Sequence, residues 1–209
     1  MMVIASLNGD ASIHSTVVDL IEACYPPTPI VDTDEHRRCV LTMQNELNGM
    51  RITDRVLEAT HTRWLMKSDL HLRAARPDIE GQESVTWHRE SFYGCPASTL
   101  NIWMPVINCT PENSVRYVPG SEEIPDERII VTSESDPTVT RGSDGSKIGL
   151  LYEPKQIIGG VDFSTVKTLN VPYGMVAIFS GQLIHGAAIN KTSGVRFSID
   201  FRIIPKRTT

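Results

Sequence analysis

Several features are scarce or missing in this 209-residue sequence, and each absence excludes a class of protein. No apolar run is long enough to cross a bilayer, and residues 1–8 carry no basic stretch of the kind that opens a secretion signal. The cysteines are scattered and form no CxxC pair, which argues against a disulfide framework and a cysteine zinc site. We therefore expect a cytoplasmic protein with reduced thiols and no membrane partner. The cysteines are Cys24, Cys39, Cys95 and Cys109.

A basic stripe is also absent. The formal charge is -5, and acidic and basic residues are mixed along the chain, so we expect no nucleic-acid partner. With 40% hydrophobic residues the chain can close one sizeable core, and a β-sandwich or barrel of this length is ordinarily one unit. We expect a single domain over residues 1–209.

Residues 1–64 are predicted to form a helical section. Apolar residues recur at helical spacing over Ser12–Cys24, and the run stops before Pro26. A second helix is predicted to begin at the cap Asp32-Thr33-Asp34 and to end at Asn48-Gly49, and a third is predicted over Thr53–Arg63. The histidines of these helices, His14, His36 and His61, are expected to be exposed.

From residue 65 onward the sequence consists of short β-rich runs separated by Gly, Pro, Asn and Ser. This order predicts a mainly β fold, a double-stranded β-helix (jelly roll, cupin-like), with the N-terminal helices packed outside. The polar stretch within 131–160 is predicted to be an active-site lid, with a disordered surface loop as the alternative. The expected strands are Leu70–Ala74, Ser84–Phe92, Thr99–Val106, Val115–Val118, Thr165–Val171, Met175–Ser180, Ile184–Ile189 and Val195–Ile204.

The chemistry is predicted to centre on His88-Arg89-Glu90 and His185. Residues two apart on a strand share a face, so His88 and Glu90 can grip one metal ion. A jelly roll can bring His185 beside them. Two imidazoles and a carboxylate on one side of an ion suit non-haem iron(II), with positions left open for a bidentate 2-oxo acid and O₂.

The run Val195–Ile204 alternates between charged and apolar residues. Arg196 and Ser198, followed in phase by Asp200 and Arg202, share one face. If that face points into the cavity between the sheets, Arg196 can hold a carboxylate by paired hydrogen bonds, with the Ser198 hydroxyl as a further donor. A carboxylate pocket is thus predicted beside the metal.

The set His88-x-Glu90, His185 and Arg196-x-Ser198 resembles the iron(II)/2-oxoglutarate dioxygenases, in particular the phytanoyl-CoA dioxygenase-like group. Segments 101–113 and 117–121 are similar to that group, and the resemblance spans about 84–202. It implies that His88, Glu90 and His185 bind iron and that Arg196, assisted by Ser198, holds the distal carboxylate of 2-oxoglutarate. Asn101 and Trp103 would line the cosubstrate pocket.

The sequence departs from the group at Glu90, where Asp is more usual, and at Ser121-Glu122, where Ser-His is common. The retained carboxylate argues against halogenation, which in relatives leaves that position to a halide. The resemblance implies release of succinate and CO₂ with hydroxylation as the default outcome. Desaturation, epimerisation and cyclisation start from the same hydrogen abstraction and remain open.

A small-molecule substrate, such as a metabolite or natural-product intermediate, is expected because the chain is small. The residues considered for substrate contact are Arg73, Arg76, Trp87, Phe92 and Arg202. Each has a structural alternative: a solvated rim for Arg73 and Arg76, core packing for the aromatic residues, and an ion pair for Arg202. A homodimer is reasonable if the helices expose an apolar face.

Two other classes remain open. The same fold could bind a metal as a cupin-type isomerase or lyase without O₂ chemistry, or it could be a non-catalytic binding module. Succinate formation separates the oxygenase from both, and metal content separates the two alternatives from each other.

Overall fold

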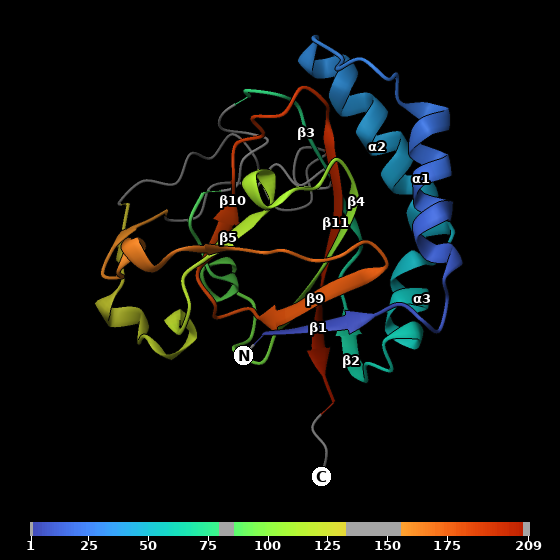
Figure 1. The fold of residues 1–209 in the computed structure, drawn as a ribbon. Helices are drawn as coiled ribbons and strands as arrows, with labels where there is room; N and C mark the ends of the chain where they lie inside the picture. Colours follow the sequence, from blue (N-terminus) through green and yellow to red (C-terminus); the bar gives the residue numbers. More distant parts are fainter. Residues whose placement is uncertain (1, 80–85, 133–155, 207–209) are drawn as a thin grey trace.

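A computed structural model describes residues 2–79, 86–132 and 156–206. Figure 1 shows helices on one side of a large sheet and smaller sheets on the other. The helices are α1 (Ser12–Cys24), α2 (Thr33–Gly49) and α3 (Ile52–Ala59). The strands are β1 (Met2–Ser6), β2 (Trp64–Lys67), β3 (His71–Ala75), β4 (Leu100–Ile107), β5 (Val115–Tyr117), β6 (Ile130–Val131), β7 (Ile157–Gly159), β8 (Lys167–Thr168), β9 (Met175–Ser180), β10 (His185–Ala187) and β11 (Arg196–Pro205).

The predicted jelly-roll class with N-terminal helices outside is confirmed. The major sheet has the order β1-β9-β4-β11-β2, and β3 also pairs with β11, so the long β11 meets β3 along its first half and β2 near its end. All of these pairings are antiparallel. Strands β10, β5 and β8 form the minor sheet, and β6 pairs with β7.

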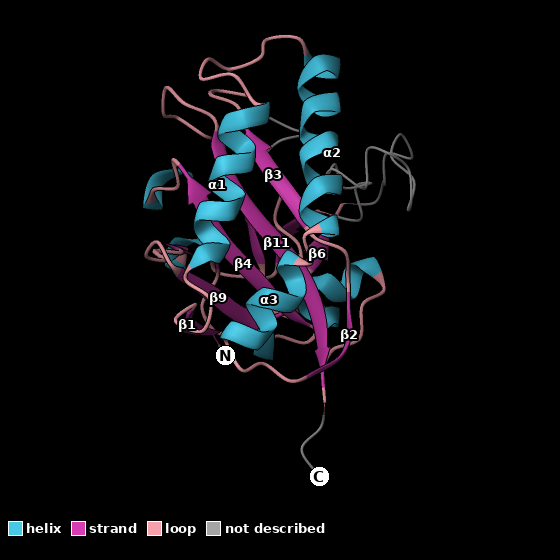
Figure 2. Ribbon diagram, turned by 90° about the vertical axis from the view of Figure 1, so that its right-hand side faces the viewer, coloured by secondary structure: helices cyan, strands magenta, loops and turns pink. Residues whose placement is uncertain are grey.

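The helices cover one face of the major sheet (Figure 2). The apolar residues of β11, Phe197, Ile199, Phe201 and Ile203, are buried in one cluster with Ile13, Val17, Met43 and Leu47 of the helices. We call this cluster the helix-side core. Burying one such side chain contributes about 1.5–3 kcal/mol, so the alternation along β11 ties the helices to the sheet.

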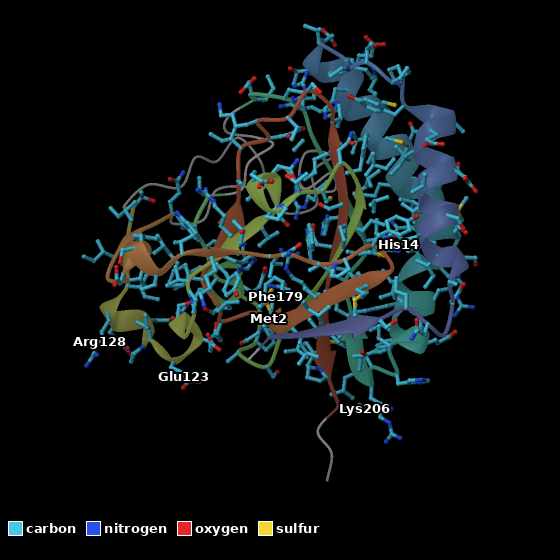
Figure 3. All side chains as sticks on the ribbon, viewed as in Figure 1. Met2, His14, Glu123, Arg128, Phe179 and Lys206 are labelled. Carbon is cyan, nitrogen blue, oxygen red and sulfur yellow. The ribbon has the colours of Figure 1, made fainter. Side chains whose placement is uncertain are left out.

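Two smaller apolar clusters flank the minor sheet. The inner cluster, between the sheets, contains Trp103, Leu169, Ala177, Phe179 and Leu183. Figure 3 shows Phe179 beside Met2, its cross-strand neighbour on β1. The outer cluster contains Val118, Ile129, Ile157 and Ile184, with Trp87 and Phe92 packed against it.

The helix boundaries follow local chemistry. As predicted, α1 ends before Pro26, and α2 begins after Asp32, whose side chain accepts a 2.7 Å hydrogen bond from the Glu35 amide. Helix α3 is shorter than predicted, because the chain leaves helical geometry at Thr60 and His61 takes a φ of 53°. A left-handed residue at this position ends a helix.

The strand predicted over Ser84–Phe92 is wrong within the described part of that range. His88 forms a single β-bridge with His185, and Glu90–Tyr93 is a 3₁₀ helix. The short edge strands β1 and β2 were not predicted. Most of the lid predicted at 131–160 lies outside the described residues, although its flanks pair as β6 and β7.

His14 and His36 were expected on the surface but are buried, and this prediction is wrong for both. Each bridges from a helix: His14 Nε2 donates to the Pro105 carbonyl at 2.6 Å, and His36 Nδ1 lies 2.7 Å from the Tyr25 hydroxyl. Figure 3 places His14 where α1 meets the sheet. Burial lowers the pKa of His14, so its neutral form is favoured.

Among the described residues, no helix combines the length and the apolar character needed to cross a membrane.

Asp10 links the start of α1 to α3 through hydrogen bonds. Asp10 accepts hydrogen bonds from Arg55 Nε and from the Ser12 hydroxyl, both at 2.7 Å, and the Arg55 bond is the main reason that the pKa of Asp10 falls to about 2 from 3.8. A depressed carboxyl pKa contributes stability above the unfolded value and loses it as the pH falls through the folded value.

Asp10→Asn should therefore lower the free energy of unfolding by about 0.5–1 kcal/mol at pH 7, the scale of a partly exposed ion pair. The difference from wild type should shrink at pH 3, as urea denaturation at the two pH values would report. Asp19→Asn, at an exposed position of α1, is the control. A difference that stays the same at pH 3 would contradict this account of Asp10.

Candidate metal centre

Two backbone segments bring the predicted ligands together. The His88 amide donates to the His185 carbonyl, and the His185 amide donates to the His88 carbonyl, both at 3.0 Å. The Glu90 amide donates to the Gly181 carbonyl at 2.7 Å. Arg89 is extended, with φ -135° and ψ 153°, so His88 and Glu90 project to the same side although no regular strand carries them. His88 and Glu90 share a face, as predicted, because the residue between them is extended.

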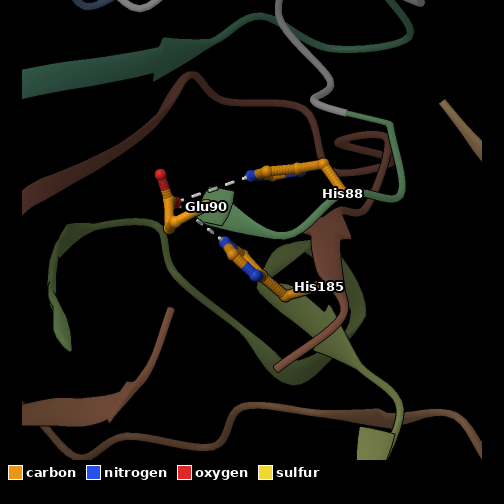
Figure 4. A group of neighbouring side chains, drawn as sticks. All are labelled: His88, Glu90 and His185. Atoms are coloured by element: carbon orange, nitrogen blue, oxygen red, sulfur yellow. Dashed lines mark ion pairs between the residues drawn. The ribbon is translucent and has the colours of Figure 1, made fainter. Parts of the chain in front are cut away.

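His88, Glu90 and His185 form one buried cluster, shown in Figure 4. The Oε1 atom of Glu90 lies 3.8 Å from His88 Nε2 and 3.7 Å from His185 Nε2. Ligand atoms about 2.0–2.2 Å from one first-row divalent ion can be at most about 4.4 Å apart, so both separations can span an ion. The donor set, two nitrogens and one carboxylate oxygen, is the facial triad of non-haem iron(II).

Both imidazoles are oriented as ligands by backbone carbonyls. His88 Nδ1 donates to Thr86 O at 2.8 Å, and His185 Nδ1 donates to Leu183 O at 2.9 Å. Each hydrogen bond places the ring proton on Nδ1 and leaves the Nε2 lone pair directed at Glu90. Such partners of the second ring nitrogen fix the tautomer and the ring orientation in metal sites.

The electrostatics hold the three side chains in the protonation states that metals need. Burial lowers the pKa of His88 to about 3, with a further contribution from His185, and burial also lowers the pKa of His185. Burial raises the pKa of Glu90, but the charge and the hydrogen bond of Arg202 oppose this, and the net shift is downward. At neutral pH both imidazoles are therefore neutral and the carboxylate is ionised, as metal binding requires.

The polar face of β11 lies opposite the helix-side core and faces this cluster. Arg202 donates from Nε to Glu90 Oε2. Asp200 is paired with Arg73 of β3, with one Nη2–Oδ2 contact at 3.1 Å. Burial raises the pKa of Asp200, but the charge and the hydrogen bonds of Arg73 outweigh this, and the net shift is downward. Of the two alternatives held for Arg202, substrate contact and an ion pair, the structure shows the ion pair, with Glu90 as the partner that accepts its hydrogen bond.

The residues predicted to form a carboxylate pocket lie further along the same face. Arg196 and Ser198 are buried, and Arg196 Nη1 donates to Ser198 Oγ at 3.3 Å. On the adjacent strand β4, Asn101 stands opposite Arg202, and Trp103 stands opposite Asp200. The four residues expected to hold the cosubstrate therefore lie on one continuous sheet surface.

Arg89 and Ser121 form hydrogen bonds that hold the backbone next to the candidate ligands, and the sequence did not predict them. Arg89, between the two first ligands, donates from Nη2 to Ser121 O at 2.6 Å, and the Ser121 hydroxyl accepts from the Ile184 amide at 2.8 Å. The turn at Ser121 thus holds the neighbours of both His88 and His185. The signal was present in the His-Arg-Glu triplet, because a charged residue between two inward-facing ligands must find partners on the other side.

Three of the residues considered for substrate contact are not brought to the triad. Arg76 is buried and donates to the carbonyls of Ile30 and Val31 at 3.0 and 2.8 Å, which fixes the connection between α1 and α2. Trp87 and Phe92 pack against the outer cluster, whose Ile184 points away from its neighbour His185. Core packing thus describes Trp87 and Phe92, whereas the solvated rim expected for Arg76 is wrong, because its guanidinium is buried against backbone carbonyls.

Residues 28–198 match the family model described as Phytanoyl-CoA dioxygenase (PhyH). No curated protein sequence matches the chain. Among solved structures, the epimerase SnoN, in complex with Fe3+, alpha ketoglutarate and nogalamycin RO, is similar at 13% identity and a TM-score of 0.55, covering 98% of this chain and 78% of that one.

Two further structures share the fold. Apo HygX from Streptomyces hygroscopicus is 14% identical, with a TM-score of 0.52, and covers 98% of this chain and 82% of its own. The alpha ketoglutarate dependent carbocyclase SnoK from nogalamycin biosynthesis is 15% identical, with a TM-score of 0.51, and covers 98% and 79% respectively. At such identities the likeness establishes the architecture alone.

The cluster predicts how the chain binds metal. His185→Ala should weaken Fe(II) binding by more than about 100-fold, because even groups that only support a ligand cost 10–100-fold when removed. The Fe(II) affinity is measured by calorimetric titration of the metal-free protein under anaerobic conditions. His61→Ala, an exposed histidine after α3, is the control and should bind as wild type does. Equal affinity in His185→Ala would remove His185 from the ligand set.

Proposed function

Since the chain belongs to the phytanoyl-CoA dioxygenase (PhyH) family of 2-oxoglutarate-dependent enzymes, we propose that it is an Fe(II)- and 2-oxoglutarate-dependent oxygenase that hydroxylates a small organic molecule. The observation that carries the proposal is the buried cluster of His88, Glu90 and His185, which faces a sheet surface carrying a buried arginine. The family match covers every one of these residues.

In this proposal His88, Glu90 and His185 hold Fe(II) through two Nε2 atoms and one carboxylate oxygen. Ring contacts keep the imidazoles in place: the His185 ring meets Phe179 edge-on at 5.1 Å between centroids, and the His88 ring meets Tyr93 edge-on at 5.2 Å. These aromatic neighbours also exclude water from the buried side of the ligands.

Arg196 and Ser198 are proposed to bind the distal carboxylate of 2-oxoglutarate. Glu90 accepts a hydrogen bond from Arg202, so the three proposed ligands lie above the 200–202 part of β11. Arg196 is four residues away on the strand, about 13 Å between backbones, which an extended arginine side chain and a five-carbon diacid can bridge together. The guanidinium suits a carboxylate because it can offer two parallel hydrogen bonds.

Asn101 supplies an observation that favours a ligand in this cavity. Its Nδ2 is buried and finds no hydrogen-bond acceptor among the described residues. A buried donor left in this state costs about 1–3 kcal/mol, so it favours a bound acceptor such as a carboxylate oxygen. Trp103, two residues along β4, would form the apolar wall of the same pocket.

Fe(II) and 2-oxoglutarate, when bound, supply the oxidation of substrate by O₂ with release of succinate and CO₂. The protein's part is to place the substrate beside the open positions of the metal. The Arg73–Asp200 pair lies on the inner face with side chains 15% and 19% exposed, and we propose that it forms the substrate side of the cavity. SnoN is known in complex with nogalamycin RO and SnoK comes from nogalamycin biosynthesis, which supports a metabolite or natural-product intermediate as the substrate class.

The cosubstrate assignment is tested by adding Fe(II) and then 2-oxoglutarate to the metal-free protein without O₂. Wild type should develop the weak visible charge-transfer band of a chelated 2-oxo acid. Arg196→Ala should need about 10–100-fold more 2-oxoglutarate for half of the band, since a hydrogen bond between charged groups contributes about 1.5–3 kcal/mol. The exposed Arg128, at the outer edge of the molecule in Figure 3, provides the control Arg128→Ala.

A protein that binds Fe(II) but develops no band at saturating 2-oxoglutarate would contradict the proposal and favour a cupin-type isomerase or lyase. A protein that binds no metal would favour a binding module. Equal 2-oxoglutarate dependence in Arg196→Ala and wild type would remove Arg196 from the pocket and leave the metal site standing.

A further inference from the structure

Glu90 is held on both of its carboxylate oxygens. Its Oε1 is directed at the two imidazoles, at 3.8 and 3.7 Å, while its Oε2 accepts a hydrogen bond from Arg202 Nε. A carboxylate bound in this way offers one oxygen to an ion and keeps the other occupied. Arg202 therefore stands where it can prevent Glu90 from chelating a metal through both oxygens, which would consume an open coordination position.

The methylene groups of Glu90 are held by a close backbone approach at Gly181. A Cβ at position 181 would lie 3.1 Å from both Cβ and Cγ of Glu90 and 3.0 Å from the Thr99 carbonyl oxygen. The Gly181 amide donates to that carbonyl at 2.8 Å, and the Gly181 carbonyl accepts from the Glu90 amide at 2.7 Å. A side chain at position 181 would thus press on the first two side-chain carbons of Glu90, and glycine there lets the Glu90 side chain lie directly against the backbone.

We propose that Arg202 and Gly181 form a frame that positions Glu90 as a one-oxygen metal ligand and makes glutamate, rather than aspartate, the acid that this site requires. Aspartate is shorter by one C–C bond, about 1.5 Å, so its carboxylate cannot reach the imidazole side and Arg202 together. The inference rests on the proposed function only in that the three residues bind a metal. Arg202 acts through Glu90 and is a positioning residue.

A positioning role and a merely electrostatic role of Arg202 predict opposite changes in metal affinity when Arg202 is removed. A guanidinium near a divalent cation repels it, so by charge alone the loss of Arg202 would tighten metal binding. Loss of a group that orients a ligand weakens binding, typically by 10–100-fold. The direction of the change therefore separates the two roles.

The test is titration of the metal-free protein with Co(II) alone, read by calorimetry and by the visible d–d absorption, whose intensity reports the coordination number. Arg202→Met should bind Co(II) about 10–100-fold more weakly than wild type with an altered spectrum, and Arg202→Lys should lose less affinity. Glu90→Asp should also bind more weakly, although it keeps a carboxylate. Arg116→Met is the matched control, because Arg116 donates to the Ala187 carbonyl at 3.0 Å on β10 and lies over Trp87, away from Glu90.

Thermal unfolding of each metal-free variant shows whether it folds. If Arg202→Met does not fold, Arg202→Lys and Glu90→Asp carry the test. Unchanged or tighter Co(II) binding in the folded Arg202 variants, or wild-type affinity in Glu90→Asp, would contradict the proposed positioning of Glu90. The assignment of the metal site would not be affected. If wild type itself binds no Co(II), the metal assignment fails first, and the proposed function fails with it.

Discussion

The Glu90 carboxylate is buried to 1% exposure, and such a charge costs several kcal/mol unless other charges and hydrogen bonds compensate. Its compensation organises the interior. Arg202 of β11 donates to Oε2 of Glu90, while Oε1 lies 3.8 and 3.7 Å from the imidazoles of His88 and His185, so three separate segments must be in register before the site is assembled. Folding of the two sheets and assembly of the site are thereby one process.

Strand β11 separates this polar interior from the apolar one. Its even-numbered residues Arg196, Ser198, Asp200 and Arg202 face the cavity, while Phe197, Ile199, Phe201 and Ile203 pack under the helices. A shift of register by one residue would exchange the two sets, burying four polar side chains, three of them charged, in the helix-side core. The helices therefore matter to the site although they supply no ligand: they hold the strand whose other face carries Arg196 and Arg202.

Period-two alternation made β11 and its polar face predictable from sequence, and helix caps and proline stops made α1 and α2 predictable. The meeting of His88 and Glu90 was predictable because the triplet needs only an extended backbone at Arg89, which the structure has, to present both side chains to one side. The partner of Arg202 was not predictable, because it depends on which non-adjacent segment crosses above the strand. The inward turn of His14 and His36 was missed for a similar reason: each is satisfied by a contact to a distant segment, Pro105 and Ala74. Trp87 looked like a wall of the site because it neighbours His88, but alternation sends it to the outer cluster.

The central claim is that the polar face of β11 and the His88–Glu90–His185 cluster together form one site for a metal and a diacid. The most direct measurement is the succinate formed from 2-oxoglutarate by the Fe(II)-loaded protein under O₂, compared with the same protein without Fe(II) and with Glu90→Ala. The account predicts one succinate for each 2-oxoglutarate consumed, dependent on both Fe(II) and O₂ and lost in Glu90→Ala. Wild-type protein that holds Fe(II) and yet forms no succinate would contradict it.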